Sequence, residues 1–87
     1  MITPIKGWED LYGITENAEV WSYLKKRFIT IQTMKTGYKF VSLYRKGKSK
    51  GCFVHRLMFE TFNRELKPNE EINHINHIRD DNRIENL

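Results

Sequence analysis

Hydrophobic and polar residues alternate along two segments in the middle of the chain, residues 38–45 and 50–56. The two segments flank the run Lys46-Gly47-Lys48-Ser49, whose composition favours a turn. Because successive side chains of a strand point to opposite faces, this pattern predicts an antiparallel hairpin with Val41 and Leu43 on one face. Large side chains occupy both faces, so the alternation leaves open which face is buried.

Shorter extended segments precede this hairpin. Turn-forming residues interrupt residues 5–22, which predicts two short strands joined near residues 16–19. Residues 28–34 are rich in β-branched side chains and predict a further strand, with Ile29 and Ile31 on one face. Three aromatic side chains of this part of the chain are expected in the core of the small sheet, namely Trp8, Tyr12 and Trp21.

The spacing of the apolar residues changes after the hairpin. Leu57, Met58 and Phe62 follow helical spacing, which predicts a helix over residues 55–63 with one stripe packed on the sheet. Asn63 is expected to end this helix. Short strands followed by one helix indicate the α+β class, as a small antiparallel β-sheet with one packed helix.

Composition narrows the class of protein. The chain has 87 residues, of which 39% are hydrophobic and 30% charged, so its length allows one small domain with a compact core. No apolar run approaches the ~20 residues that span a bilayer, and the N-terminal residues lack the apolar stretch of a secretory signal. The single cysteine, Cys52, excludes an internal disulfide framework. We therefore expect a soluble, cytoplasmic protein with no membrane partner.

The basic residues are concentrated in one block. Ten of the 15 lysines and arginines lie between Val20 and Phe59, and all 11 acidic residues lie outside this window. Because neutralising DNA phosphates releases counterions, such a block favours a polyanionic partner. A solvated basic face, or lysines that protect a hairpin edge from aggregation, is the simpler alternative. The residues predicted to contact DNA phosphates, with a few reading base edges, are Lys25, Lys26, Arg27, Lys35, Lys39, Arg45, Lys46, Lys48, Lys50 and Arg56.

Two sets of side chains near the hairpin allow more than one interpretation. Tyr38, Phe40 and Tyr44 interleave with cations, as in platforms that stack single-stranded bases. A domain this small is nevertheless expected to need at least one of them in its core. His55 is expected to be a packing or phosphate-contact residue rather than a catalyst.

The most informative polar stretch is Ile72-Asn73-His74, with Asn86 twelve residues after the histidine. Hydrolysis of a phosphodiester needs a base near neutral pH, and a histidine with its ordinary pKa of ~6.5 suits that role. It also needs oxygen ligands for a hard cation, which an asparagine carbonyl can supply. On composition alone, however, a histidine among asparagines in a polar tail is more often solvated.

Two other patterns in this region carry less information. Cys52, His74 and His77 lack the paired spacing of structural zinc sites, so we do not expect zinc. Asn82, three residues before Glu85, resembles the capping box at the start of a helix.

The segments described above, taken together, resemble a phage-type HNH homing endonuclease with a nuclease-associated modular motif at its front. The match runs through nearly all of the chain, and the order and spacing of its pieces make it specific. The motifs that carry it are Ile5-Lys-Gly7-Trp8-Glu9-Asp-Leu-Tyr12-Gly-Ile14-Thr15-Glu-Asn17, Glu19-Val20-Trp-Ser22, Gly37-Tyr38, Val41-Ser-Leu43, Gly47-Lys48, Val54-His55-Arg56-Leu57, Phe62, Ile72-Asn73-His74 and Asn82-Arg83-Ile84-Glu85-Asn86-Leu87.

This resemblance implies a DNA endonuclease and a role for each residue of its signature. The histidine of the family's motif is the general base, here His74, and the residue before it is a metal ligand, here Asn73. The asparagine twelve residues later steadies the loop and the histidine, and it falls on Asn86. The resemblance also implies a ββα-metal module with one divalent ion, Mg²⁺ or Mn²⁺.

The resemblance further implies how the chain is organised and what it binds. The front sheet is expected to dock in the major groove of double-stranded DNA, which a two-stranded ribbon fits. Residues 1–69 are then the DNA-binding β-sheet region, and residues 70–87 are the first part of the HNH module. The expected source is a phage or its bacterial host.

Three departures from the family's pattern affect this interpretation. Ala18 stands where the family usually has glycine, so Asn17 is expected to take the positive φ of that turn. Asn76 and His77 replace an Asp-Gly pair. The chain also stops at Leu87, before the second strand and the helix with the third signature residue, which predicts an incomplete module in a fragment or natural truncation.

Two other functions are compatible with the sequence. One is a non-catalytic DNA-binding module or decayed nuclease, which would bind DNA with a similar salt dependence but would not cleave it. The other is a protein-interaction domain whose basic face meets an acidic partner. A nicking assay separates the nuclease from the first alternative, and duplex binding at moderate salt separates it from the second.

Overall fold

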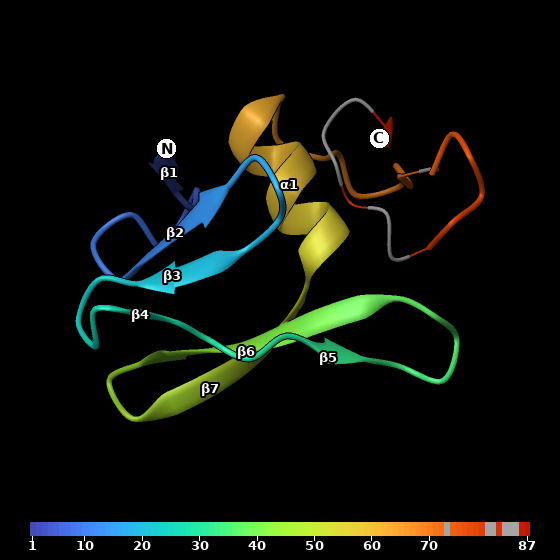
Figure 1. Ribbon diagram of the computed structural model, residues 1–87. Helices are drawn as coiled ribbons and strands as arrows, with labels where there is room; N and C mark the ends of the chain where they lie inside the picture. The colour runs from blue at the N-terminus through green and yellow to red at the C-terminus, as the bar shows by residue number, and fades with distance from the viewer. Residues whose placement is uncertain (73, 80–81, 83–85) are drawn as a thin grey trace.

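The computed structural model describes residues 1–72, 74–79, 82 and 86–87 (Figure 1). The elements of this part of the chain are β1 (Ile2–Pro4), β2 (Tyr12–Thr15), β3 (Val20–Ser22), β4 (Arg27–Phe28), β5 (Gln32–Thr33), β6 (Lys39–Arg45), β7 (Lys48–Phe53) and α1 (Val54–Phe62). Strands β1 to β4 form one antiparallel sheet in sequence order, and β5 to β7 form a second. The predicted α+β class is therefore confirmed. No helix among the described residues has the length and apolar character needed to cross a bilayer.

The first sheet contains the hairpin predicted near the N-terminus. Residues 16–19 join β2 to β3, and Thr15 closes the turn from both sides. The Thr15 N–H donates to the Glu19 carbonyl at 2.9 Å, and the Ala18 N–H donates to the Thr15 carbonyl at 3.0 Å. These bonds place the reversal at Ala18, which has φ 64°. The prediction that Asn17 would take this conformation is wrong.

The single strand predicted over residues 28–34 is also wrong, because the two sheets share this segment. Its first part belongs to β4, which pairs with β3, and its last part contains β5, which pairs with β6. Ile29 and Ile31 lie between the two strands and are partly buried against the core. A β-branched composition suits either sheet, so it could not reveal that the chain crosses from one to the other.

The central hairpin β6–β7 is confirmed, with a shorter turn than predicted. Only Lys46 and Gly47 lie between the paired strands. Their φ angles are 51° and 78°, and two successive positive values are typical of a type I′ turn, whose twist matches that of the strands. Val41 and Leu43 form the buried face of β6, which answers the question that the alternation left open.

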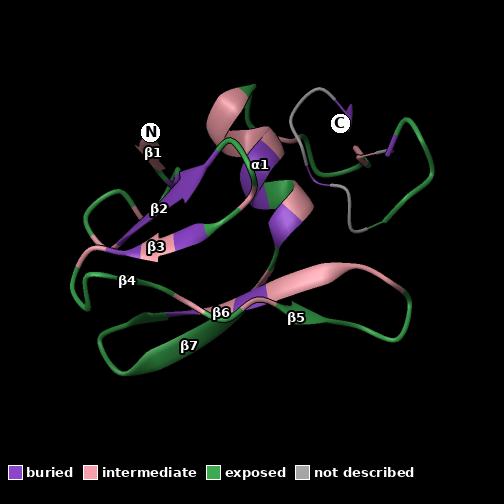
Figure 2. Ribbon diagram, in the orientation of Figure 1, coloured by how far each residue is buried: buried purple, intermediate pink, exposed green. Residues whose placement is uncertain are grey.

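Helix α1 begins directly after β7 and packs against β6 and β7. It covers Val54–Phe62, one residue earlier at each end than the predicted range of 55–63, and Asn63 follows it. Figure 2 shows that the buried positions face the space between the helix and the two sheets. The helix and both sheets share one hydrophobic core: Ile5, Tyr12, Ile14, Val20, Val41, Leu43, Val54, Leu57 and Met58.

The three aromatic residues expected in the core have different positions. Tyr12 is buried, and Trp8 is partly buried against the core with its ring centroid 6.0 Å from that of Tyr12. Trp21 lies on the opposite face of β3 from the buried Val20, because adjacent residues of a strand point to opposite faces. Its ring packs on Phe28 of β4 at 4.9 Å instead, so the prediction for Trp21 is wrong.

We call residues 1–62 the body and residues 63–87 the C-terminal segment. The described residues of the C-terminal segment form no α-helix or strand, and they run beside α1 and past the turn between β5 and β6 (Figure 1). Arg64 and Glu70 close the first loop of the segment through two N–O contacts of 2.7 and 2.6 Å. The capping box predicted at Asn82 depends on Glu85, which lies outside the described residues.

Candidate functional site

The loop after His74 is held by asparagine side chains. Asn86 is buried, and its carbonyl accepts a hydrogen bond from the Ile75 N–H at 2.8 Å. Its Oδ1 accepts another from the Asn76 N–H, and its Nδ2 donates to Asn76 Oδ1, both at 3.0 Å. Asn76 Oδ1 also accepts from the Ile78 N–H at 2.9 Å. These bonds agree with the loop-steadying role that the resemblance implies for Asn86.

His77 lies at the apex of this loop in a left-handed conformation, with φ 61°. Its N–H donates to the His74 carbonyl at 2.9 Å, which closes a turn immediately after the predicted base. The family pattern has glycine, the residue that favours this conformation, at the position of His77. The turn therefore forms here without glycine. The cost of a left-handed non-glycine residue is about 1–2 kcal/mol.

His74 is buried, with 7% of its surface exposed, and a side chain of the same segment contacts its ring through a polar atom. Asn82, of which 3% is exposed, places its Oδ1 2.7 Å from His74 Nε2. The other polar atom of that amide, Nδ2, is buried and has no hydrogen-bond partner in the described part of the chain. The described partner of the imidazole is therefore Asn82, whereas the described bonds of Asn86 hold the loop.

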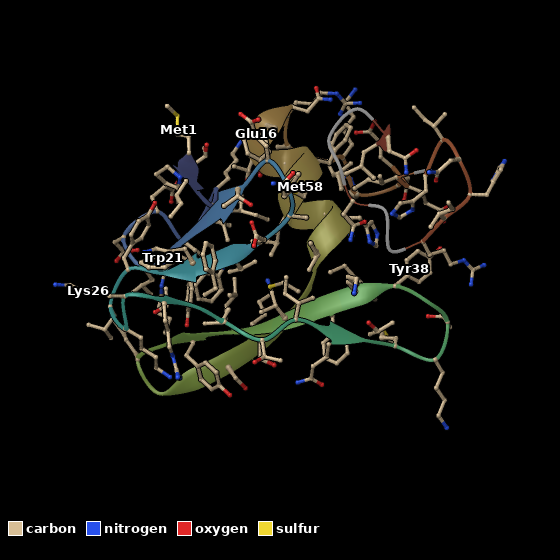
Figure 3. The ribbon with its side chains drawn as sticks, in the orientation of Figure 1. Met1, Glu16, Trp21, Lys26, Tyr38 and Met58 are labelled. Atoms are coloured by element: carbon tan, nitrogen blue, oxygen red, sulfur yellow. The ribbon has the colours of Figure 1, made fainter. Side chains whose placement is uncertain are left out.

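The body contributes an aromatic wall to the same site. The ring centroid of His74 lies 6.0 Å from that of Tyr38, just before β6, and 5.2 Å from that of His55, in the first turn of α1. Tyr38 also packs against His55, at 5.2 Å, and against Phe53, at 6.0 Å. In Figure 3, Tyr38 lies at the end of β6 that is next to the C-terminal segment. Two ring-bearing side chains of the body, Tyr38 and His55, thus pack against the imidazole of His74.

His55 is affected electrostatically by this packing. Burial, followed by electrostatic interaction with His74 and with the positive charge of Arg56, lowers the pKa of His55 to about 4. Its Nδ1 is buried and has no hydrogen-bond partner among the described residues. His55 is therefore neutral at physiological pH. This agrees with the packing role expected from the sequence.

A hollow of about 460 Å³ opens next to His74. Its lining includes Tyr38, His77 and Arg79. The Arg79 guanidinium donates to the Thr36 carbonyl at 2.8 Å and lies 5.0 Å from the centre of the Tyr38 ring. A guanidinium held in this way can pair with a phosphate. The imidazole of His74 lines the same hollow.

Two members of this site, Asn82 and Arg79, were not predicted as functional. Arg79 lies outside the basic block, and its contacts to residues 36 and 38 join parts of the chain more than 40 residues apart. Asn82 follows His74 by eight residues, and the described residues of this segment form no α-helix or strand whose period would have predicted the contact. The sequence predicted Asn82 as the cap of a helix. Its contact with His74 depends on the conformation of the loop, which local sequence patterns do not encode.

The metal site implied by the resemblance does not fit the described residues. Within them, no group of three or more His, Cys, Asp or Glu side chains could hold a metal ion. Asn73, the predicted ligand, lies outside the described residues. Cys52 lies on β7, where burial raises the pKa of its thiol.

The predicted DNA-contacting cations fall into separate groups. Lys25, Lys26 and Arg27 are exposed at the turn from β3 to β4, and in Figure 3 Lys26 points away from the body at the end far from Tyr38. Lys35 is exposed in the turn between β5 and β6. Lys39 is partly buried, and its ammonium donates to Thr33 Oγ1 at 3.3 Å. These residues therefore do not form one continuous patch with the hairpin cations.

The cations of the hairpin lie on its inner side. Cross-strand pairing places Lys50 opposite Leu43 and Lys48 opposite Arg45, so all three basic side chains share the face that carries the buried Leu43. Lys46 is exposed in the turn. Arg45 is already engaged, since its Nη2 donates to the Gly7 carbonyl at 2.9 Å and to Asp10 Oδ1 at 3.3 Å.

Where these side chains meet the helix, they line a basic hollow of about 600 Å³. Lys50 and Arg56 line it together with Arg45 and Lys6. Of these four residues, Lys6 was not among the predicted cations. The carboxylate of Glu60 lines it as well. The outer face of the hairpin is neutral by contrast, because the residues at its alternate positions are Phe40, Ser42, Tyr44, Ser49, Gly51 and Phe53.

Comparison with known proteins connects this site to a family. Residues 52–87 match the family model described as HNH endonuclease. Over 83 residues the chain is 31% identical to DNA endonuclease I-HmuI of Bacillus phage SP01, a match that covers 95% of this chain and 48% of that protein. A solved structure of DNA binding and cleavage by the HNH homing endonuclease I-HmuI matches 99% of this chain and 49% of that chain, with a TM-score of 0.90 and 29% identity. The chain thus spans about half the length of its matched relative.

Proposed function

Because the chain is a relative of the phage HNH homing endonucleases, we propose that it acts in the hydrolysis of phosphodiester bonds of double-stranded DNA, with His74 as the general base. The observation that carries the proposal is the arrangement of His74 itself. Its imidazole is buried and held by Asn82 through one nitrogen, and it lines the hollow that also holds the Arg79 guanidinium. A base and a guanidinium that can pair with phosphate in one hollow are two of the groups that this reaction uses.

The proposed chemistry assigns a separate task to each group. His74 takes a proton from the water that attacks the phosphorus, a contribution of about 10²–10⁴ to the rate for a well-placed base. Arg79 carries two-pronged donors that fit phosphate oxygens and pairs with the negative charge there. Tyr38 and His55 keep the imidazole in place from the side of the body. Asn86 keeps the loop that bears His74 closed.

A divalent metal ion is general to HNH nucleases and would neutralise the departing oxyanion. The described residues do not form a site for it on their own. The ligand role of Asn73, and Mg²⁺ or Mn²⁺ as the ion, are therefore predictions that depend on residues outside the described part of the chain. The roles proposed for His74 and Arg79 do not depend on the metal ion.

The proposed DNA contacts follow the division into residues 1–69 for binding and 70–87 for chemistry. The exposed cations at Lys25, Lys26, Arg27, Lys35 and Lys46 are free to approach phosphates without rearrangement of the core. The basic hollow between β7 and α1 offers a second contact surface through Lys50 and Arg56. Each phosphate contact contributes to a linear decrease of log affinity with log salt concentration. The affinity of the chain for duplex DNA should therefore decrease steeply as salt is raised.

A plasmid-nicking assay tests the proposal. The full chain is incubated with supercoiled DNA in the presence of Mg²⁺ or Mn²⁺, and the rate of nicking is compared with that of His74→Ala. Loss of the base is expected to reduce the rate by about 10²-fold or more, with DNA affinity unchanged and partial recovery on addition of free imidazole. Undiminished nicking by His74→Ala contradicts the proposal.

The alternative is a non-catalytic DNA-binding module or decayed nuclease. This alternative predicts salt-dependent binding to duplex DNA and no nicking with either metal ion. The protein-interaction domain predicts neither binding at moderate salt nor nicking. The same assay, accompanied by a binding titration, therefore separates all three functions.

A further inference from the structure

We propose that Asn82 is a positioning residue that selects the tautomer of His74. In the tautomer that it selects, Nε2 carries the proton and Nδ1 keeps the lone pair that acts as the base. The inference deepens the proposed function and rests on it for its catalytic meaning. The structural part concerns only which ring nitrogen is protonated, so it can be tested without activity.

The contact between the two side chains is short and shielded from water. Asn82 Oδ1 lies 2.7 Å from His74 Nε2, at the short end of the range for N–H···O hydrogen bonds. Only 7% of His74 and 3% of Asn82 are exposed, so solvent does not compete for this bond. A neutral imidazole has one donor and one acceptor nitrogen, and the oxygen of a side-chain amide can only accept. Nε2 must therefore be the donor, which leaves Nδ1 unprotonated.

The orientation of the Asn82 amide is what makes this selection. With the amide turned by half a rotation, its NH₂ group would face Nε2 and would force the opposite tautomer, with the lone pair used up in the buried bond. In the present orientation, Asn82 Nδ2 is buried and has no hydrogen-bond partner among the described residues. The Oδ1 contact with His74 is therefore the described polar contact of this amide.

The two asparagines of the signature thus have different tasks. The described hydrogen bonds of Asn86 tie Ile75 and Asn76 into a closed loop. The bond of Asn82 goes to the ring of the base. The resemblance implied that Asn86 steadies both the loop and the histidine, and the geometry points to Asn82 for the second task.

Nuclear magnetic resonance of the full chain with ¹⁵N-labelled histidine tests the tautomer directly. In a neutral imidazole, long-range proton–nitrogen correlations distinguish the protonated from the unprotonated ring nitrogen, and the spectrum is recorded at about pH 8. His74 is expected to show a protonated Nε2, with a proton protected from solvent exchange, and an unprotonated Nδ1. The spectrum of His74→Gln identifies which signals belong to this residue.

Two variants of Asn82 sharpen the test. Asn82→Ala should lose the protected Nε2 proton and should acquire a population of the Nδ1-protonated form. Asn82→Asp should retain the wild-type pattern, because a carboxylate also only accepts, and it serves as the conservative rescue. A protonated Nδ1 in the wild-type protein overturns the inference. The inference is also overturned if Asn82→Ala has the same ratio of the two tautomers as the wild type and the same protection of the Nε2 proton from exchange.

The kinetic arm separates positioning from a purely structural role. Asn82→Ala is expected to reduce kcat for nicking at least tenfold with an unchanged affinity for DNA, and Asn82→Asp is expected to recover most of that loss. An equal kcat in wild type and Asn82→Ala contradicts the positioning role. If the wild-type chain does not nick DNA but shows the expected tautomer, the proposed function fails and the assignment of Asn82 stands.

Discussion

The body and the C-terminal segment are stabilised in different ways. The body excludes water from apolar side chains, and seven of them, among them Ile14, Leu43 and Met58, are at most 1% exposed. The described part of the C-terminal segment has no such core, and polar contacts hold it instead, from Asn86 to Asn76 and from Arg64 to Glu70. Its buried residues His74, Asn82 and Asn86 are polar.

This difference explains where the candidate chemistry lies. A hydrophobic core tolerates the replacement of one apolar residue by another of similar volume, whereas a buried hydrogen bond requires a particular atom at a particular place. The described part of the C-terminal segment therefore carries specific polar geometry, and Tyr38 and His55 of the body pack against its imidazole. The two regions should thus respond differently to substitution, to local opening and to pH.

The largest effect is expected from the core of the body. Met58 is completely buried between α1 and the sheets, so Met58→Ala should lower the free energy of unfolding by about 2–5 kcal/mol. Because the wall of the site belongs to the body, unfolding should release the C-terminal segment in the same transition. Urea denaturation followed by tryptophan fluorescence measures this change. Met34→Ala, at a position 39% exposed, is the matched control and should change stability by no more than about 0.5 kcal/mol.

A smaller and more local effect is expected in the C-terminal segment. Asn86→Ala removes the acceptor of the Asn76 N–H and the donor to Asn76 Oδ1, at a cost of about 1–3 kcal/mol for the unsatisfied groups. Amide hydrogen exchange should accelerate at residues 75, 76 and 78, while the amides of β2 and β6 keep their protection. A decrease in global stability as large as that of Met58→Ala would show that the two regions are not separable.

The smallest effect is expected from His55, which lies where the two regions meet. Its pKa is about 4 in the folded protein, against an ordinary value of 6.5. Between pH 6.5 and 4 the unfolded chain binds a proton that the folded chain does not, so this residue makes stability decrease as the pH falls through that window. Above pH 6.5 it contributes no pH dependence. Glu70, whose pKa Arg64 and the Lys67 N–H lower to about 2, stays charged in the folded protein throughout this range.

His55→Phe keeps an aromatic ring against Tyr38 and Phe53 and removes the titrating group. The difference in unfolding free energy between the variant and the wild type should therefore change between pH 6.5 and 4 and should be constant above pH 6.5. The half-buried position of His55 limits its size, because solvent screens part of the charge. A difference that is constant across the whole range would contradict the lowered pKa.

Local sequence patterns were sufficient to predict the central hairpin and the helix. The alternation around Val41 and Leu43, and the turn at Gly47, predicted the central hairpin, and the helical spacing of Leu57 and Met58 predicted α1 to within one residue. The order of the signature residues around His74 predicted the relationship to HNH endonucleases. These features depend on neighbours within a few positions, and a linear sequence displays them directly.

The tertiary structure alone decided what depends on contacts between distant residues. It divided residues 28–34 between two sheets and turned the lysines of β7 to the inner face of the hairpin. It brought Tyr38 and His55 against His74, and it placed Asn82 at the imidazole nitrogen. The physical reason is that strand pairing and buried hydrogen bonds are set by the geometry of the whole chain, whereas propensity and periodicity act over only a few residues.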